Sequence, residues 1–381
     1  MTPQFVRWIG AVAGLLIVIW TAQSVLRSLI VPRGLASRLA AIVSRNVRGT
    51  ILLVANRFDT YVAKDAVMAL QAPVFLVFLL ASWLALFLIG YALMLWPLIG
   101  VSFGDALLES GSSMFTLGFA GTHEVGATSL HFLAAATGLI VVALQIAYLP
   151  TLYAAFNRRE TVVTILQSRA GAPAWGPEIL ARHQAVGIVG DLAGLYAEWE
   201  RWAADVAESH TNYPVLIFFR SPHALRSWVL GLLAVMDSAA LYLALSPSLA
   251  PTQARLCVRM GFTCLRSVAD VLDISYDTDP FPEDPIELTY EEFTGGVRRL
   301  EEVGFPIERP AQEAWSDFKG WRVNYESIAY MLADLVVAPP GPWSGGRNHL
   351  PELAIIPQRP ADRRPDDTGA KARPRGQGTG W

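Results

Sequence analysis

The chain has 381 residues, of which 53% are hydrophobic, and a formal net charge of −3. Such a composition is unusual for a wholly soluble protein, and the apolar residues concentrate before residue 158. Basic and acidic residues are interspersed, which predicts no nucleic-acid partner. Cys257 and Cys264 match no zinc-site spacing, so we expect buried free thiols in a reducing cytosol.

The N-terminal segment 8–31 is an apolar run long enough to cross a bilayer as a helix. No small-residue cleavage site follows it before the basic loop, which favours a retained transmembrane helix over a signal peptide. Segment 34–70 has apolar residues at helical spacing with interleaved arginines. This pattern is typical of an amphipathic helix at the membrane surface, and a plain connecting helix is the alternative.

Two further apolar segments, 72–97 and about 130–156, also have the length of membrane spans. Residues 66–157 contain no lysine or arginine, whereas the loop 33–64 carries six basic residues and Arg158 and Arg159 follow the last span. The positive-inside rule therefore places 33–70 and everything after 158 in the cytoplasm, and 99–129 outside. We expect a multi-pass protein of the inner membrane, with the cytoplasmic part at residues 158–381.

The segment 103–122, FGDALLESGSSMFTLGFAGT, lies between these two spans. Its first half has helical spacing over about 104–115, and Ser112 and Ser113 precede a Thr-Leu-Gly-Phe-Ala run at 116–120. A polar segment with glycines is often a simple external loop. Backbone at membrane depth is tolerated only where it lines a cavity or is buried in protein, and the helical half favours such a re-entrant segment.

Over residues 72–157 the chain resembles the pore module of the potassium-channel superfamily, in which backbone carbonyls of a Thr-Val-Gly-Tyr-Gly strand replace the water shell of the ion. The resemblance implies a selectivity filter at Thr116, Leu117, Gly118, Phe119 and Ala120. It also implies a homotetramer, because one chain supplies one of the four loops.

The resemblance leaves several points open. Ala120 stands where those channels have a second glycine, and Gly121 where an aspartate is common. A positive φ at Ala120 would cost about 1 kcal/mol or more, so the outer filter would be reshaped. Glu109 would hydrogen-bond behind the filter or face the outer vestibule, and Gly138 is a hinge candidate for gating with a packing role as the alternative. Potassium is the expected permeant ion, with a nonselective cation pore as the variant and no other metal or cofactor.

Residues 158–338 predict a cytosolic helical domain, with helices near 177–209, 222–245, 251–273, 288–303 and 309–337. The apolar segment 228–245 has Asp237 at its centre, where a charge is costly in a membrane. We therefore expect a buried central helix with Asp237 hydrogen-bonded to a polar neighbour. The glycines between Gly187 and Gly194 have the wrong spacing for a dinucleotide site and suggest close helix packing instead.

No catalytic constellation can be assembled, so we expect no enzyme. The stretches 208–210 and 220–223 contain nucleophile and base types but read as helix-end and loop residues, or as part of a ligand pocket. A small-molecule or protein regulator of this domain is left open. Residues 339–381 are rich in proline, glycine and charge, which predicts disorder.

The sequence thus predicts an all-α membrane protein with a helix–P-loop–helix channel pore, one extra N-terminal transmembrane helix and a cytosolic α-helical domain. The predicted parts are an N-terminal helix with a basic linker, a pore domain, a cytosolic domain and a tail, at residues 1–71, 72–157, 158–338 and 339–381. The expected function is a tetrameric potassium channel in membrane lipid. A membrane-anchored signalling or interaction protein without a pore is the alternative.

Overall fold

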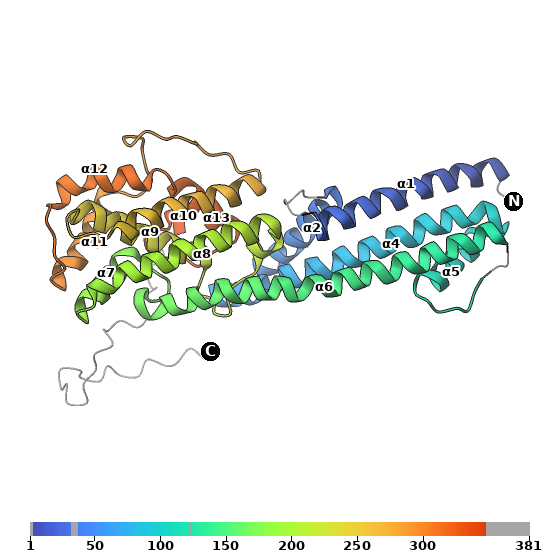
Figure 1. Cartoon of the computed structure of the whole chain (residues 1–381), viewed down its shortest axis with the longest axis horizontal. Helices are drawn as coiled ribbons and strands as arrows, with labels where there is room; N and C mark the ends of the chain where they lie inside the picture. The colour runs from blue at the N-terminus through green and yellow to red at the C-terminus, as the bar shows by residue number, and fades with distance from the viewer. Residues whose placement is uncertain (1–2, 32–36, 122–123, 348–381) are drawn as a thin grey trace, which may run out of the picture. The chain divides into compact units, whose positions relative to one another are not determined.

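The computed structural model describes residues 3–31, 37–121 and 124–347. Every regular element in these ranges is a helix, as the sequence predicts, and they contain no strand (Figure 1). In chain order the α-helices are α1 (Gln4–Leu29), α2 (Arg38–Ala55), α3 (Tyr61–Met68), α4 (Gln71–Ile99), α5 (Phe103–Met114), α6 (Val125–Ala170), α7 (Gly176–Ala185), α8 (Leu192–Asn212), α9 (Trp228–Leu245), α10 (Thr252–Val271), α11 (Tyr290–Glu302), α12 (Ala311–Arg322) and α13 (Glu326–Leu335). Short 3₁₀ helices lie at η1 (Val189–Asp191), η2 (Pro214–Phe218) and η3 (Gly345–Arg347).

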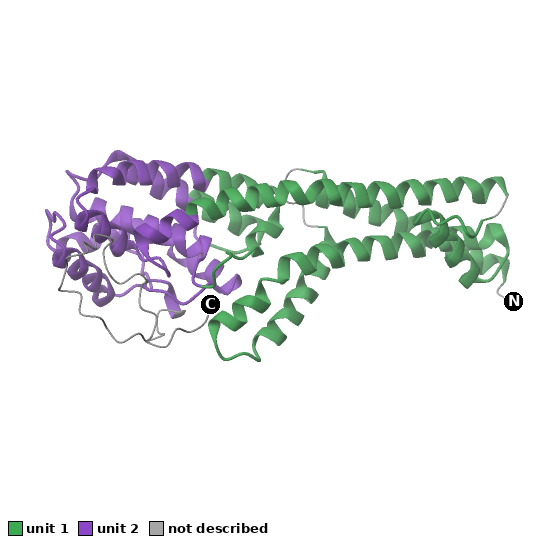
Figure 2. Cartoon of the chain, turned by 90° about the horizontal axis from the view of Figure 1, so that it is seen from below, with its two compact units in different colours: residues 1–162, 204–224, 263–276 green, residues 163–203, 225–262, 277–381 purple. Residues whose placement is uncertain are grey.

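The chain divides into two compact units, drawn in green and purple in Figure 2. Unit 1 comprises residues 1–162, 204–224 and 263–276, and unit 2 comprises residues 163–203, 225–262 and 277–381. Three segments that the sequence assigned to the cytosolic domain, 158–162, 204–224 and 263–276, therefore belong to unit 1. One reason is an apolar cluster in which residues of the η2 region pack on the first turns of α4 and the middle of α6, namely Val215, Leu216, Phe219, Ala72, Leu76, Leu152 and Ala155.

Helices α1 and α4 of unit 1 lie side by side, and their closest approach depends on two glycines (Figure 1). A Cβ placed on Gly14 would lie 2.5 Å from the carbonyl oxygen of Gly90. A Cβ on Gly90 would lie 2.7 Å from Val18 Cγ2. Small residues that let two backbones approach are typical of helix packing within membranes.

The basic linker forms two helices, so the prediction of one helix over 34–70 is wrong. Helix α2 ends at Ala55, and α3 begins after Thr60, whose hydroxyl accepts a hydrogen bond from the Ala63 amide at 3.4 Å. An N-cap of this kind satisfies an amide that the first turn of a helix leaves without a partner. The apolar face of α2 is buried through Leu39, Val43 and Val47.

Within the described residues, four helices have the length and composition to cross a membrane, namely α1, α6, α9 and the continuous stretch of α3 and α4. The most apolar window is 22% buried in α1 and in α6, and 28% buried in the stretch 61–99. Helix α6 runs 46 residues through Pro150, well beyond the end predicted near residue 156. The apolar side chains that these helices leave exposed fit a multi-pass protein in contact with lipid.

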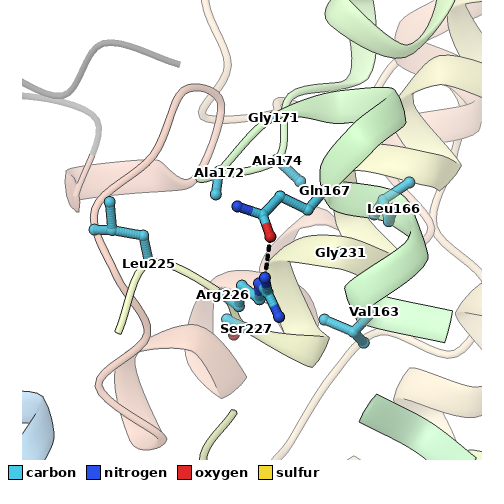
Figure 3. A pocket seen from close by; sticks show the side chains of 10 residues that line it. All are labelled: Val163, Leu166, Gln167, Gly171, Ala172, Ala174, Leu225, Arg226, Ser227 and Gly231. Atoms are coloured by element: carbon cyan, nitrogen blue, oxygen red, sulfur yellow. Dashed lines mark hydrogen bonds between the residues drawn. The ribbon is translucent and has the colours of Figure 1, made fainter. Parts of the chain in front are cut away.

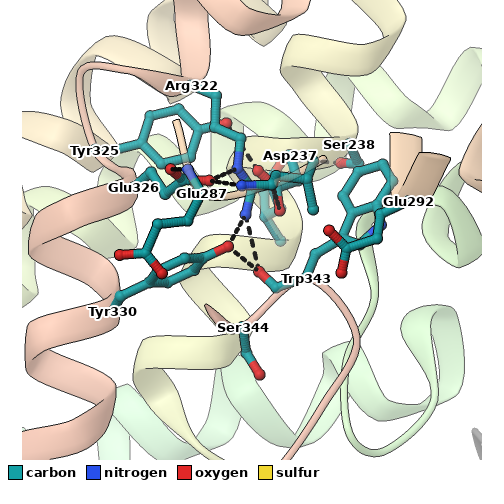
Figure 4. A network of polar contacts seen from close by, with 12 residues as sticks. Asp237, Ser238, Glu287, Glu292, Arg322, Tyr325, Glu326, Tyr330, Trp343 and Ser344 are labelled. Carbon is teal, nitrogen blue, oxygen red and sulfur yellow. Dashed lines mark hydrogen bonds and ion pairs between the residues drawn. The ribbon is translucent and has the colours of Figure 1, made fainter. Parts of the chain in front are cut away.

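Helix α9 differs from the other three because 94% of its window is buried within the protein. Its central Asp237 is 1% exposed. Asp237 pairs with Arg322 of α12 at 2.7 Å and accepts a hydrogen bond from Tyr325 at 2.8 Å (Figure 4). The predicted buried helix with a hydrogen-bonded Asp237 is thus confirmed.

Two of the helices predicted in the cytosolic part are broken in the structure. The segment 177–209 divides at Gly187, which adopts φ +73° directly after α7. The segment 309–337 divides between α12 and α13. Close helix packing was the wrong account of the glycines, because a Cβ on Gly187, Gly190 or Gly194 would meet nothing within 4 Å.

Aromatic and thiol side chains fill the core of residues 158–338, and the buried thiols are as the sequence predicts. Trp199 and Trp202 are buried with their ring centroids 4.5 Å apart, and Cys257 and Cys264 are buried free thiols. Burial raises the pKa of both thiols, because it disfavours the charged thiolate.

The prediction of disorder from residue 339 is wrong for residues 339–347, and the remainder of the predicted tail lies outside the described residues. Trp343 is 3% exposed and packs edge-on against Trp175 and Phe318. Its carbonyl oxygen accepts hydrogen bonds from Arg322 at 2.8 Å and from Tyr330 at 3.2 Å (Figure 4). A single large aromatic side chain and one backbone acceptor therefore hold this proline-rich segment in place.

Candidate functional site

The short helix predicted near 104–115 is present as α5, packed against α4 and α6. Ser102 caps its first turn by accepting a hydrogen bond from the Asp105 amide at 3.2 Å. The Ser110 hydroxyl donates to the Leu88 carbonyl of α4 at 2.9 Å, and Ser110 is fully buried. Trp96 at the end of α4 packs edge-on against Phe103. These contacts fix α5 beside α4, as the sequence predicts for a short helix between two spans.

The loop that follows α5 begins with a tight reversal. The Thr116 amide donates to the Ser113 carbonyl at 2.9 Å, and the Leu117 amide donates to the Ser112 carbonyl at 2.8 Å. This pair of hydrogen bonds is the Schellman arrangement that ends many helices. It requires a left-handed backbone at Thr116, whose φ is +55°. A positive φ at a β-branched residue is rare and costly.

The sequence predicts a reshaped outer filter, because a positive φ at Ala120 would be costly. The described loop has its positive φ angles at Thr116 and Gly118 instead. Gly118 has φ +71°, and a Cβ there would meet nothing within 4 Å. The predicted freedom of Gly118 is used, whereas Ala120 keeps an ordinary φ. The strain arises at Thr116 because α5 ends at Met114 and Thr116 directly follows the C-cap residue, Phe115.

Ser112 holds both ends of the loop. Its carbonyl accepts from the amides of Leu117 at 2.8 Å and Gly118 at 3.4 Å, and its hydroxyl accepts from the Ala120 amide at 3.0 Å. Among the described residues, no hydrogen bond reaches the carbonyl oxygens of residues 116–120. Three amides thus turn toward α5, and the carbonyls remain available to another partner.

The apolar side chains of the loop are not covered within the chain. Leu117 is 62% exposed and Phe119 is 64% exposed. Ser112, in contrast, is 1% exposed. The base of the loop is therefore well packed, while its tip presents apolar surface that water solvates poorly.

Glu109 contacts a histidine of α6. Its Oε2 atom lies 3.2 Å from Nε2 of His131 on α6, and the two side chains are 15% and 11% exposed. Glu109 was predicted to lie behind the filter or to face the vestibule, and its contact with His131 was not predicted. The available signal was that, outside the tyrosines, His131 is the lone ionisable side chain in residues 125–157.

The hinge candidate Gly138 lies where the end of α5 meets α6. A Cβ on Gly138 would fall 2.2 Å from the carbonyl oxygen of Met114 and 2.9 Å from its Cγ. Any larger residue there would push α5 away from α6. This contact gives Gly138 a packing role, and a hinge role stays a prediction. Ser113, the other predicted pore-helix serine, contributes its carbonyl to the helix end.

The nucleophile and base types noted in the sequence form structural contacts within unit 1. Buried Arg159 lies 3.0 Å from His210 Nε2 and donates to the carbonyl oxygens of Leu216 at 2.8 Å and Phe219 at 2.6 Å. Burial, followed by the nearby Arg159 charge, holds the pKa of His210 well below its usual range. Arg220 pairs with Asp65 of α3 at 2.5 Å. These groups fasten the η2 segment, and Ser209 Oγ lies 3.0 Å from Nδ1 of the neighbouring His210.

A small cavity in unit 2 is shown in Figure 3. Its volume of about 10 Å³ is room for about one water molecule. Arg226 at its edge donates to Gln167 and, at 3.1 Å, to Thr164. The described residues also contain no cluster of three metal-ligating side chains. Neither feature supports a small-molecule or metal site in this unit.

The α5 helix and its loop are therefore the strongest functional candidate in the described residues. The structure brings the predicted residues 109–120 together beside α4 and α6, with three loop amides bonded to Ser112 and no hydrogen bond to the carbonyls of 116–120 from the described residues. Comparisons of the chain with protein-family models, curated proteins and solved structures find no match. The functional argument consequently rests on this geometry and on the charge pattern of the sequence.

Proposed function

We propose that this protein is a homotetrameric cation channel whose filter is formed by the backbone carbonyls of residues 116–120. The observation that carries the proposal is the loop on Ser112, in which three amides are bonded to α5 and the carbonyls have no partner among the described residues. Carbonyl oxygens held in this way can replace the water molecules around a permeant cation.

Four copies are proposed because one loop cannot surround an ion. A filter of this kind takes one loop from each subunit around a common axis. The exposed tip, with Leu117 and Phe119, and the exposed side of α6, with Phe132 at 73% and Leu139 at 67%, supply apolar surface for contact with other copies and with lipid. In an isolated chain nothing covers these apolar side chains.

The charge pattern supports a cation as the permeant ion. No lysine or arginine lies between residues 66 and 157, while Asp105 and Glu124 flank the loop on the side proposed to be external. Four copies of these carboxylates would raise the local cation concentration at the mouth. The C-terminal end of α5 adds partial negative charge where the loop begins. Potassium is the proposed ion, and a nonselective cation pore is the variant because Ala120 replaces a glycine of the resembling channels.

The proposal includes a membrane topology and a cellular location. The basic residues at 33–64 and at 158–159 place these segments in the cytoplasm of a cell with an inner membrane, and the α5 loop outside. The protein works by transport down a gradient and not as an enzyme. Residues 158–381 are proposed to be cytoplasmic and to assemble or regulate the pore, with a protein partner or small molecule as the regulator.

The test is cation flux into liposomes that contain the purified full chain. Wild type should pass potassium in preference to sodium, and Gly118→Ala should lose potassium flux. Ser112→Ala should lower the potassium-to-sodium ratio, because the Ala120 amide loses its acceptor. Ser82→Ala is the matched control, since that hydroxyl bonds only to the Phe78 carbonyl on an exposed turn of α4.

Unchanged flux ratios in both Gly118→Ala and Ser112→Ala would contradict a filter at residues 116–120. Equal potassium and sodium flux in wild type, abolished in Gly118→Ala, would keep the pore and remove the claim of selectivity. Absence of flux from a particle that contains fewer than four copies would sink the channel proposal. The membrane-anchored signalling protein would then be the better account.

A further inference from the structure

The Glu109–His131 contact joins the helix that carries the loop to the helix after it. His131 lies on the α6 side chain stripe that includes the buried residues Ala127 and Ala134, and two turns later the same stripe reaches Gly138 against Met114. Helix α5 therefore meets α6 at its middle through an ionisable pair and at its end through close backbone packing. The end contact involves no ionisable group, whereas the middle contact joins two ionisable side chains.

Few other charges surround this pair. Helix α4 contains no charged residue between Gln71 and Ile99, and α6 contains no other acid or base between 125 and 157 except tyrosines. The Asp105 carboxylate on α5 accepts from its own cap, Ser102, at 2.8 Å. Glu124 is exposed two turns before His131. The described charges of α1 are Arg7, which stacks on Trp96, and Arg27.

We propose that the Glu109–His131 contact is a proton-operated latch that fixes the α5 loop in its carbonyl-open form when the external side is acidic. Histidine is the side chain that gains charge between about pH 8 and pH 5. A protonated His131 attracts the Glu109 carboxylate through a largely buried contact, where such attraction is strong. A neutral His131 lacks the charge and offers the carboxylate only a neutral N–H donor, which is the weaker interaction.

The latch reaches the loop through one helical turn. Glu109 and Ser112 are three residues apart on α5, so a displacement of Glu109 moves Ser112 with it. Ser112 is the acceptor for the amides of Leu117, Gly118 and Ala120. The proposed effect on conduction rests on the proposed function, but the effect of pH on the order of α5 and its loop does not.

The test measures hydrogen exchange of residues 103–121 in the full chain in lipid, at about pH 6 and about pH 8, corrected for the intrinsic pH dependence of exchange. In wild type, the amides of residues 103–121 should exchange more slowly at the lower pH, by a factor of about five or more. His131→Gln and Glu109→Gln should each abolish this difference. His223→Gln removes an exposed histidine far along the chain and should retain it.

A difference that persists in His131→Gln, or that is absent in wild type, overturns the latch. Cation flux from the same preparations supplies the second readout, with wild-type flux expected to be higher at about pH 6 than at about pH 8 and His131→Gln flux expected to be insensitive. Protected exchange without flux in any variant, from a particle with fewer than four copies, would retain the latch and reject the channel. Flux without pH-dependent exchange would retain the channel and reject the latch.

Discussion

Helices α4 and α9 are both long apolar helices, and composition alone makes both of them candidate spans. The two helices differ in how far the rest of the chain buries them. The most apolar window of the α3–α4 stretch is 28% buried and contains no charge, whereas that of α9 is 94% buried and encloses Asp237 with its partners Arg322 and Tyr325. The apolar surface of α9 is buried within the chain itself. The apolar surface of α4 is largely exposed in the single chain and needs lipid or further copies to cover it.

This difference indicates how each region is stabilised. Around α9, burial is complete enough that a charge must be paired to be tolerated. Around α4 and α6, close approach of backbones at Gly14, Gly90 and Gly138 takes the place of a large core. Substitutions should therefore act through charge in one region and through volume in the other.

The largest effect is expected for Asp237→Ala in the α9 region. The substitution leaves the fully buried Arg322 short of one carboxylate, which should lower the free energy of unfolding by about 3–5 kcal/mol. Chemical denaturation in detergent measures the loss. Arg309→Gln is the control, because its pair with Asp317 is exposed and should matter by less than about 1 kcal/mol. Equal losses in the two variants would break the comparison.

A smaller loss is expected for Gly138→Ala in the α6 region. The new methyl group would overlap the Met114 carbonyl, so α5 must shift at a cost of about 1–3 kcal/mol. Gly126→Ala on the same helix is the control, since its nearest neighbour is 3.9 Å away. Thermal unfolding in a fixed detergent compares the two. A neutral Gly138→Ala would show that volume does not control packing here.

Thr116→Gly should stabilise the protein while impairing the proposed filter. Glycine relieves the positive φ at this position, for a net gain of up to about 1 kcal/mol. The more flexible loop should pass sodium and potassium less selectively. Thr116→Ala retains the strain and should gain no stability. A Thr116→Gly variant with lower stability than wild type would show that the left-handed turn is not strained.

The smallest effect is a pH dependence at His210, which is buried beside Arg159. Its pKa in the folded state is well below the usual value, so below about pH 6.5 the unfolded chain binds a proton that the folded chain does not. The free energy of unfolding should thus fall as pH decreases through that range. His210→Gln should reduce this slope. A steeper slope in the variant would mean that the histidine is charged in the folded protein.

The sequence predicted what depends on local pattern. The apolar runs fixed the existence of α1, α4 and α6, and the lone acid within 228–245 identified α9 as a core helix. Contacts between distant segments were not predictable. The pairing of Glu109 with His131 depends on the rotation of α5 against α6, and the strain at Thr116 depends on the exact end of α5. Composition also misjudged residues 339–347, which Trp343 anchors.

The most direct test of the channel account is single-particle imaging of the full chain in lipid nanodiscs. The account predicts four copies around one axis, with the carbonyls of residues 116–120 facing that axis, with α4 and α6 in lipid and with α9 outside it. A monomer, or an assembly whose 116–120 loops are apart from one another, would contradict the channel.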